Sequence, residues 1–350
     1  MKKSLILVAS LTAAAAACAQ SSITLFGIAD ASLSRGTGSV ADRTQMLRGG
    51  NASNRIGFRG TEDLGGGMSA QFWLEAGMNL DDGSGQATNV NNQTPGAAGA
   101  AGSQGLTFAR RSTLGLASNW GEIRFGRDIV PQYWNMLFAD PFGNIGVGAA
   151  VNYTAIITGV TNTRASNMVS YFTPAGLGGF SAQVSHYLGE NASNAANPDD
   201  GRGTGLRVGY AKGPFSAGLA WSRTDYAAGE VEQRNVNASW NFGVAKLMAT
   251  FNSDEAGALR ARGVTVGLLA PVGSGEFKAA YSQHKTDAAG EPGAKKFAVG
   301  YVHNLSKRTA LYGTFARLKN SGGASFALNG AVTGPNTSSN GFDLGIRHSF

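Results

Sequence analysis

The sequence predicts an all-β protein built as a 16-stranded antiparallel transmembrane β-barrel, and three observations predict it. Apolar and polar residues alternate in about sixteen segments, with the two-residue period of a β-strand. Short and long connections alternate between these segments. After Gln20 no apolar window is long enough for a membrane-spanning helix, which needs about 20 residues.

The first residues indicate export. Two lysines precede an apolar run that ends in small residues before Gln20, which is the layout of a cleaved secretory signal. We therefore expect residues 1–19 to be removed and residues 20–350 to form the barrel. Lipid attachment to Cys18 is the minor alternative, because Ala15 stands where a lipoprotein signal usually has leucine. Since Cys18 is the only cysteine, the mature chain has no thiol for a disulfide or a Cys-based metal site.

The strand pattern is clearest in "GMSAQFWLEAGMNL", where Phe72, Leu74 and Ala76 alternate with Gln71 and Glu75. Most segments are close to the ~10 residues that a tilted strand needs to cross a bilayer. Their predicted centres lie near residues 28, 56, 74, 112, 124, 169, 184, 208, 219, 237, 248, 265, 280, 300, 314 and 345. Aromatic residues expected in the girdles at the headgroup level are Phe180, Trp240, Phe242, Tyr312 and Phe350.

The connections predict how the barrel is oriented. Short joints such as "SNWG", "AKGP" and "NFG" alternate with long polar stretches, at 34–50, 81–103, 129–162, 189–204 and 320–338. Short periplasmic turns with long extracellular loops are the plan of an outer-membrane barrel. A soluble two-sheet sandwich would also alternate, but it has no reason to segregate its loop lengths. A closed barrel leaves no unpaired strand edge, as a bilayer requires.

The last segment, "NGFDLGIRHSF", predicts what each barrel face contacts. Phe342, Leu344 and Phe350 fall on one side, and Asp343 and Arg347 fall on the other. We expect the first side to face lipid and the second to face water inside the barrel. A final strand that ends on Phe350 also has the form of the signal read by the outer-membrane assembly machinery. A soluble β domain that ends on phenylalanine is the alternative.

Four stretches carry a family resemblance: "QSSITLFGIADASL", "NRIGFRGTEDLGGGMSAQFWLEAG", "RRSTLGLASNWGEIRFGR" and "YVHNLSKRTALYGTFARLKN". They resemble the general porins of the β-proteobacterial outer membrane, relatives of the neisserial porins, over essentially the whole mature chain. The resemblance implies a sixteen-stranded barrel, a homotrimer and a third extracellular loop folded into the channel. Some members have a Pro-Glu-Phe-Phe-Gly turn in that loop. This chain has Asp140, Pro141, Phe142 and Gly143, without the glutamate.

Alternation also assigns the charged residues of the inner wall. Because Ile56 and Phe58 are apolar, Arg55 and Arg59 should point inward, and the same rule applies along the other strands. The predicted inner bases are Arg55, Arg59, Arg111, Arg124, Arg164, Arg207, Lys246, Lys278 and Arg347. The predicted inner acids are Asp30, Glu75, Glu122, Glu276 and Asp343, and Asp140 is expected in the inserted loop. Each arginine could instead be a wall residue paired with a carboxylate, but the cluster as a whole predicts a basic patch that attracts anions.

These features favour a passive outer-membrane channel for ions and small hydrophilic solutes, with a preference for anions. The expected partners are a second and third copy of the chain, outer-membrane lipid and lipopolysaccharide, the assembly machinery, and small anions. The alternatives are a channel specific for phosphate or carboxylates, an adhesin or receptor barrel, and a barrel hydrolase. The sequence lacks a Gly-x-Ser-x-Gly elbow, a His-Glu-x-x-His motif and a long basic run. We therefore expect no catalytic residues, cofactor, metal or nucleic-acid partner.

Overall fold

The structure, a computed structural model, describes residues 22–93, 105–151 and 159–350. The predicted signal segment 1–19 and its cleavage point lie outside these residues. The strands are β1 Ser22–Thr37, β2 Arg43–Leu47, β3 Arg55–Gly65, β4 Met68–Gly77, β5 Arg111–Ser118, β6 Gly121–Ile129, β7 Arg164–Phe172, β8 Phe180–Tyr187, β9 Gly203–Lys212, β10 Phe215–Thr224, β11 Val231–Asn241, β12 Lys246–Ala256, β13 Leu259–Val272, β14 Gly275–Thr286, β15 Gly293–Asn304, β16 Thr309–Ser321 and β17 Ser338–Ser349. The helix α2 spans Pro131–Leu137.

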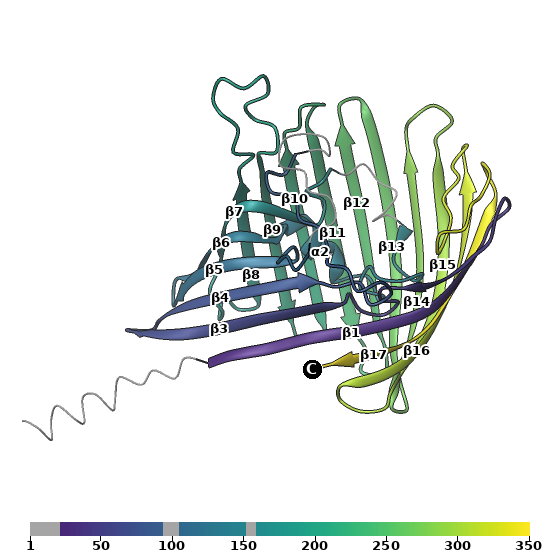
Figure 1. Cartoon of the computed structure of the whole chain (residues 1–350), viewed down its shortest axis with the longest axis horizontal. Coiled ribbons are helices and arrows are strands. Elements are labelled where there is room, and N and C mark those ends of the chain that lie inside the picture. The colour runs from purple at the N-terminus through teal and green to yellow at the C-terminus, as the bar shows by residue number, and fades with distance from the viewer. Residues whose placement is uncertain (1–21, 94–104, 152–158) are drawn as a thin grey trace, which may run out of the picture.

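One antiparallel sheet closes into a barrel (Figure 1). The first strand, β1, pairs with β3 on one side and with β17 on the other, so the ring has no free edge. The short strand β2 lies in the first loop and pairs with the outer end of β1, where Ser32 faces Leu47. The predicted sixteen-stranded barrel is therefore confirmed. Each predicted strand centre falls within β1 or one of the strands β3–β17.

Burial in this barrel is inverted relative to a soluble domain. Leu25, Leu114 and Leu344 are more than half exposed on the outer face. Ser185 and Asn252, on the inner face, are fully buried. A sandwich would bury its apolar faces against each other, so the two-sheet alternative is excluded. The α2 helix is far too short to cross a membrane, and no helix of the described ranges could do so.

The connections differ in length between the two ends of the barrel. At one end, all seven strand pairs are joined by short turns, the longest at 173–179. At the other end the loops are L1 38–54, L2 78–110, L3 130–163, L4 188–202, L5 225–230, L6 257–258, L7 287–292 and L8 322–337. The predicted short turns are confirmed. The five predicted long stretches are also found at the opposite end, as L1, L2, L3, L4 and L8. The loops L5, L6 and L7 are shorter, and L6 is a tight turn between the long strands β12 and β13.

The third long loop, L3, folds into the barrel, as predicted. Its helix α2 contacts β8–β11 (Figure 1). Asn135 Nδ2 donates to Asn235 Oδ1 at 2.7 Å, which fixes the helix to the inner wall. Further along, the Val147 N–H donates to Asp343 Oδ2 at 2.8 Å, and the Val151 N–H donates to Ser282 Oγ at 2.9 Å. The loop therefore crosses the lumen from β9–β11 to β14–β17.

Aromatic rings line the short-turn end of β8–β12 on the outer face. Successive ring centroids lie 4.7, 6.3, 6.1 and 6.4 Å apart along Phe180, Tyr210, Phe215, Trp240 and Phe242. This row has the form of a headgroup girdle. Tyr312 was predicted to belong to such a girdle, and this is wrong. It lies on the inner face, only 2% exposed, where its hydroxyl donates to Asp30.

Candidate functional site

The inner wall formed by β3–β6 carries a cluster of charges centred on Glu75 of β4. Arg110 Nε donates to Glu75 Oε1 at 2.6 Å, and Arg55 Nη1 lies 3.4 Å from the same oxygen. The Trp73 indole N–H donates to the other oxygen at 3.0 Å. Glu75 is only 6% exposed. One carboxylate therefore holds two guanidinium groups against the wall, with an excess of one positive charge.

A second cluster surrounds Arg124 of β6. Its Nε and Nη2 donate to the two oxygens of Glu122 at 2.8 and 2.9 Å, and its Nη1 donates to Asp128 Oδ2 at 2.6 Å. Arg111 Nε lies 3.5 Å from the same Asp128 oxygen. Two arginines and two carboxylates thus balance. Arg124 is therefore a wall residue whose charge is paired with carboxylates, as the sequence analysis allowed for each arginine.

Arg59 of β3 stands beside these clusters without a carboxylate partner among the described residues. Its guanidinium carbon lies 5.1 Å from the centroid of the Trp73 ring, and that of Arg111 lies 4.5 Å from it. Both arginines, Trp73 and Glu122 line a recess of about 290 Å³ in the wall. Stacking leaves the N–H edge of Arg59 free to receive an anion, whereas Arg111 Nε donates to Thr113 Oγ1 at 3.0 Å and lies beside Asp128.

Arg207 of β9 connects the wall to L3. Its Nε donates to Asn135 Oδ1 of α2 at 3.3 Å, and its guanidinium carbon lies 4.8 Å from the Phe138 ring. No carboxylate of the described residues pairs with it. The inner-wall group therefore comprises six arginines, Arg55, Arg59, Arg110, Arg111, Arg124 and Arg207, and three paired carboxylates, Glu75, Glu122 and Asp128.

Several other inner carboxylates are occupied by backbone donors. Asp30 and Asp343 are fully buried: Asp30 accepts the N–H groups of Gly50, Asn51 and Ala52, and Asp343 accepts the N–H group of Val147. Asp140, which is 6% exposed, accepts the N–H groups of Phe142, Asn144 and Ala150 within L3. Burial raises the pKa of the Asp140 carboxyl, while these three donors act in the opposite direction. These acids shape L1 and L3.

Arg164 was predicted to point inward, on the assumption that residues of β7 alternate regularly along the whole strand. The alternation is interrupted within β7. The pairing of β6 with β7 shifts near Asn167, which has a positive φ of 55°, so that Ala165, not Ser166, lies opposite Asp128 and Arg164 lies opposite Ile129. One extra residue reverses the face of every residue beyond it. Arg164 Nε instead donates to the carbonyl oxygen of Arg110 at 2.7 Å. Its charge lies at the base of L3. There the Val130 N–H donates to the Thr163 carbonyl oxygen and joins the two ends of the loop.

Three residues of the site were missed by the sequence reasoning. Asp128 lies an even number of residues after Glu122 and Arg124, so the alternation rule could have assigned it to the inner face with them. Arg110 precedes its strand, where alternation says nothing. Arg127 bonds to the Ala109 carbonyl at 2.6 Å and to Ser166 Oγ at 2.9 Å, and so ties the end of L2 to β7. No group of three or more potential metal ligands occurs among the described residues.

A closed sixteen-stranded barrel with an inserted third loop and a charged inner wall defines an outer-membrane channel protein. The Gram-negative porin family profile matches residues 5–323. The chain is 38% identical to outer membrane porin protein 32 of Delftia acidovorans, over 100% of both chains. This chain belongs to the Gram-negative porin family and is a protein of the outer membrane.

Two solved structures extend the comparison. An anion-selective porin from Comamonas acidovorans is 35% identical and superimposes with a TM-score of 0.82, over 95% of this chain and 100% of that one. The trimer form of OmpT from Vibrio cholerae is 13% identical, with a TM-score of 0.68 over 94% and 99% of the two chains. The second likeness concerns the fold alone.

Proposed function

We propose that this porin is an anion-preferring diffusion channel whose constriction lies between L3 and the arginines of the β3–β6 wall. Ions and small hydrophilic solutes cross it passively, and it catalyses no covalent reaction. The pore-lining roles fall to Arg55, Arg59 and Arg111, with Arg207 on the L3 side. Arg124, Glu75 and Glu122 hold the wall in place, and Asp140 holds the loop.

The excess of bases over carboxylates in the inner-wall group carries this proposal. The carboxylates Asp30, Glu75, Asp128, Asp140 and Asp343 are all 8% exposed or less. The side chain of Arg55 keeps 25% exposure and that of Arg111 keeps 21%, and among the three carboxylates of the inner-wall group only Glu122 keeps a comparable 19%. Six arginines against three carboxylates leave the inner-wall group with three extra positive charges. Fixed charge in a confined pore concentrates counter-ions.

The preference should depend on salt concentration. Arginine keeps its charge at every accessible pH, so the field persists. Screening limits its reach to about 8 Å at physiological ionic strength and about 3 Å at 1 M. We therefore expect anion preference in dilute salt that weakens in concentrated salt. The relative from Comamonas acidovorans, which is described as anion-selective, supports the same reading.

The test is the zero-current potential of the purified channel under a KCl gradient in planar bilayers. Arg59→Ser combined with Arg207→Ser removes two charges without stranding a carboxylate, so anion preference should fall while conductance persists. Arg124→Ser combined with Arg164→Ser should also lower it. Arg223→Ser combined with Arg234→Ser removes two charges from the outer face, so it is the matched control and should leave the anion preference unchanged. A cation-preferring wild type, or an unchanged Arg59/Arg207 double variant, would contradict the proposal.

The recess lined by Arg59 and Arg111 favours a second candidate, a channel specific for phosphate or carboxylates. Such a channel would show currents that saturate with the preferred anion and are blocked by it. A general porin would show conductance that rises with salt in the ordinary way. Titrating phosphate into chloride at constant ionic strength separates the two.

We also propose that the chain assembles as a homotrimer. The outer face of β1 and β3–β5 is apolar and includes a groove of about 180 Å³ lined by Ile23, Ala70, Phe72 and Leu114, among others. Such a surface suits close contact between barrels. Native mass spectrometry should give three chains per particle. Migration of the unheated protein at the monomer size would contradict the trimer.

A further inference from the structure

The last loop, L8, folds inward and packs against L3. Leu328 of L8 is buried in the same apolar cluster as Val147 of L3, on the inner wall of β14–β16, and Phe326 of L8 packs against this cluster. Val147 and Leu328 also meet at Gly341 of β17, where an added Cβ would come within 2.3 Å of the first and 2.9 Å of the second. The two loops therefore share one small core inside the barrel.

A single carboxylate joins the same two loops by hydrogen bonds. Asp343 of β17 accepts the Val147 N–H of L3 on Oδ2 at 2.8 Å, and it accepts the Asn329 side-chain amide of L8 on Oδ1 at 2.7 Å. The Asn329 amide also donates to the Phe342 carbonyl at 3.2 Å. Because Asp343 is fully buried, both of its bonds are charge-assisted and formed away from water, where such bonds are strong. L8 therefore orients the group that holds L3.

A buried base holds the carbonyl side of the same residue. Lys296 of β15 donates from Nζ to the Val147 carbonyl at 3.1 Å and to the Ala149 carbonyl. Lys296 is only 6% exposed, and its charge interacts with those of Asp140 and Asp343. Buried charges are costly unless they are hydrogen-bonded. The Val147 backbone is thus held between an acid of β17 and a base of β15, and these bonds favour one position of L3.

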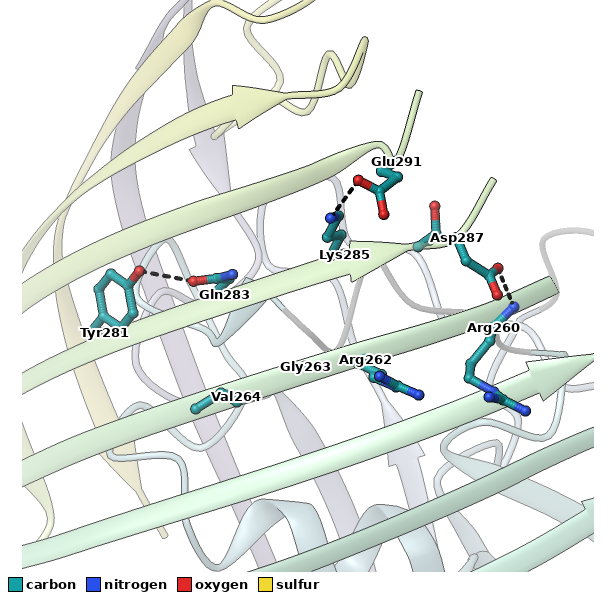
Figure 2. Close-up of a pocket in the computed structure, with 10 residues that line it drawn as sticks. Arg260, Arg262, Gly263, Val264, Tyr281, Gln283, Lys285, Asp287 and Glu291 are labelled. Atoms are coloured by element: carbon teal, nitrogen blue, oxygen red, sulfur yellow. Dashed lines mark hydrogen bonds and ion pairs between the residues drawn. The ribbon is translucent and has the colours of Figure 1, made fainter. Parts of the chain in front are cut away.

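The neighbouring loop L7 is fastened on the opposite side of the wall. Figure 2 shows its ties on the outer face: Lys285 Nζ donates to Glu291 Oε2 at 2.7 Å, and the Arg260 backbone N–H donates to Asp287 Oδ1 at 2.7 Å. These residues line a groove of about 480 Å³ between β13 and β14. The ties of L7 therefore lie away from the lumen and from L3, whereas those of L8 lie against it.

We propose that L8 positions the constriction loop through Asp343, with Lys296 as a second positioning residue. The inference rests on the proposed constriction between L3 and the β3–β6 wall, and it adds what fixes the width of that constriction. Asn329 keeps the Asp343 carboxylate in place, and Leu328 covers the Val147 side chain. When L8 is loosened, L3 loses part of its hold on β14–β17. A change at the extracellular surface of L8 is in this way transmitted to the pore.

The test follows the position of L3 with one thiol in the purified full chain. Ala150 is buried against Met136 and Tyr133 of the same loop, and the described residues contain no cysteine, so Ala150→Cys provides a single reporter in L3. Mass spectrometry of the peptide that contains residue 150 gives the rate of modification by a charged maleimide. Adding Asn329→Ala should raise this rate about tenfold or more, because a lost buried, charge-assisted hydrogen bond shifts the docking of L3 by that factor. Single-channel currents should become noisier.

A double-mutant cycle tests whether L8 acts through the carboxylate. Asp343→Ala should raise the labelling rate at least as much as Asn329→Ala does. Adding Asn329→Ala to Asp343→Ala should change the rate by less than about twofold, because the amide then has no carboxylate to orient. Additive effects would overturn the proposal. Lys296→Met should also raise the rate. Asn329→Ala alters only a loop and decides the question by itself where Asp343→Ala does not fold.

The matched control is Glu291→Ala, which removes the outer-face tie of L7. Its labelling rate should stay within about twofold of the parent with the reporter alone. Heat-modifiable gel migration verifies that every variant is folded. An unchanged rate in the Asn329 variant, or an equal rise in the Glu291 variant, would overturn the proposal. So would a parent thiol that reacts as fast as an exposed one, because L3 would then not be docked. Labelling does not depend on ion preference, which the zero-current potential tests separately.

Discussion

The ring of Phe350 occupies the place that a side chain on Gly27 would take, and the two backbones bond to each other in both directions. The Gly27 N–H donates to the Phe350 carbonyl at 2.9 Å, and the Phe350 N–H donates to the Gly27 carbonyl at 3.1 Å. A Cβ at Gly27 would collide with the Phe350 ring and with the Arg55 carbonyl oxygen. The last residue of the chain therefore completes the seam that closes the barrel.

Gly27→Val should slow closure of the barrel and destabilise it by about 1–3 kcal/mol, because the new side chain overpacks the seam. The measurement is the midpoint of heat-induced unfolding on unheated and heated gels. Ala29→Val, on the same outer face of the same strand, is the control and should be tolerated. A Gly27→Val protein as stable as wild type would show that the Phe350 ring moves aside freely.

Deletion of Phe350 should reduce the amount of folded protein in the outer membrane while synthesis and secretion continue. The deletion removes both seam hydrogen bonds and the exposed aromatic at the chain end, which is 43% exposed. Fractionation followed by immunoblotting measures the folded and periplasmic pools. Phe350→Tyr retains an aromatic and the backbone, and should assemble normally. Wild-type surface levels in the deletion variant would refute a role in assembly.

Glu75→Gln should increase anion preference and decrease stability. The change removes the negative charge shared by Arg55 and Arg110 and keeps a side chain of similar size. Weakening these buried, charge-assisted hydrogen bonds costs about 1–3 kcal/mol. The zero-current potential and the thermal midpoint test the two effects together. Glu62→Gln, on an exposed part of β3, serves as the control. A shift toward cations would contradict the charge assignment.

Asp140→Ala should loosen L3 and make the single-channel current noisier. The carboxylate accepts three backbone N–H groups of the loop, and each buried donor left without a partner costs about 1–3 kcal/mol. Asp199→Ala removes an exposed acid from L4 and provides the control. Quiet single-channel records in the Asp140 variant, with wild-type conductance, would show that other contacts suffice to hold the loop.

The mature chain should begin at Gln20. The small residues before it and their spacing from Lys2 and Lys3 predict cleavage after Ala19. Intact mass of the protein extracted from outer membranes measures the first residue directly. A mass that includes a diacylglyceryl group on Cys18 would show lipoprotein processing instead.

The sequence by itself determined the barrel and much of its wall. The two-residue alternation shows which face of a strand is apolar. It depends only on residues close together in the chain, so all sixteen strands could be located. The same rule correctly placed Phe342, Leu344 and Phe350 on the outer face. It also brought Arg55, Arg59, Arg111 and Arg124 to the inner face, with Glu75 and Glu122 beside them. Local patterns suffice there because neighbouring strands pair in chain order.

Only the tertiary structure decided which charges are free. Arg124 is balanced by Glu122 and Asp128, whereas Arg59 has no carboxylate partner among the described residues. Asp140 and Asp343 accept hydrogen bonds from backbone N–H groups of L3. These outcomes depend on contacts between residues far apart in the chain, such as Val147 with Asp343, and alternation carries no information about them. The face of Arg164 is reversed by one extra residue in β7. Tyr312 faces inward, where its hydroxyl donates to Asp30. A single sequence does not encode either contact as a pattern, because each depends on how the strands register in the closed ring.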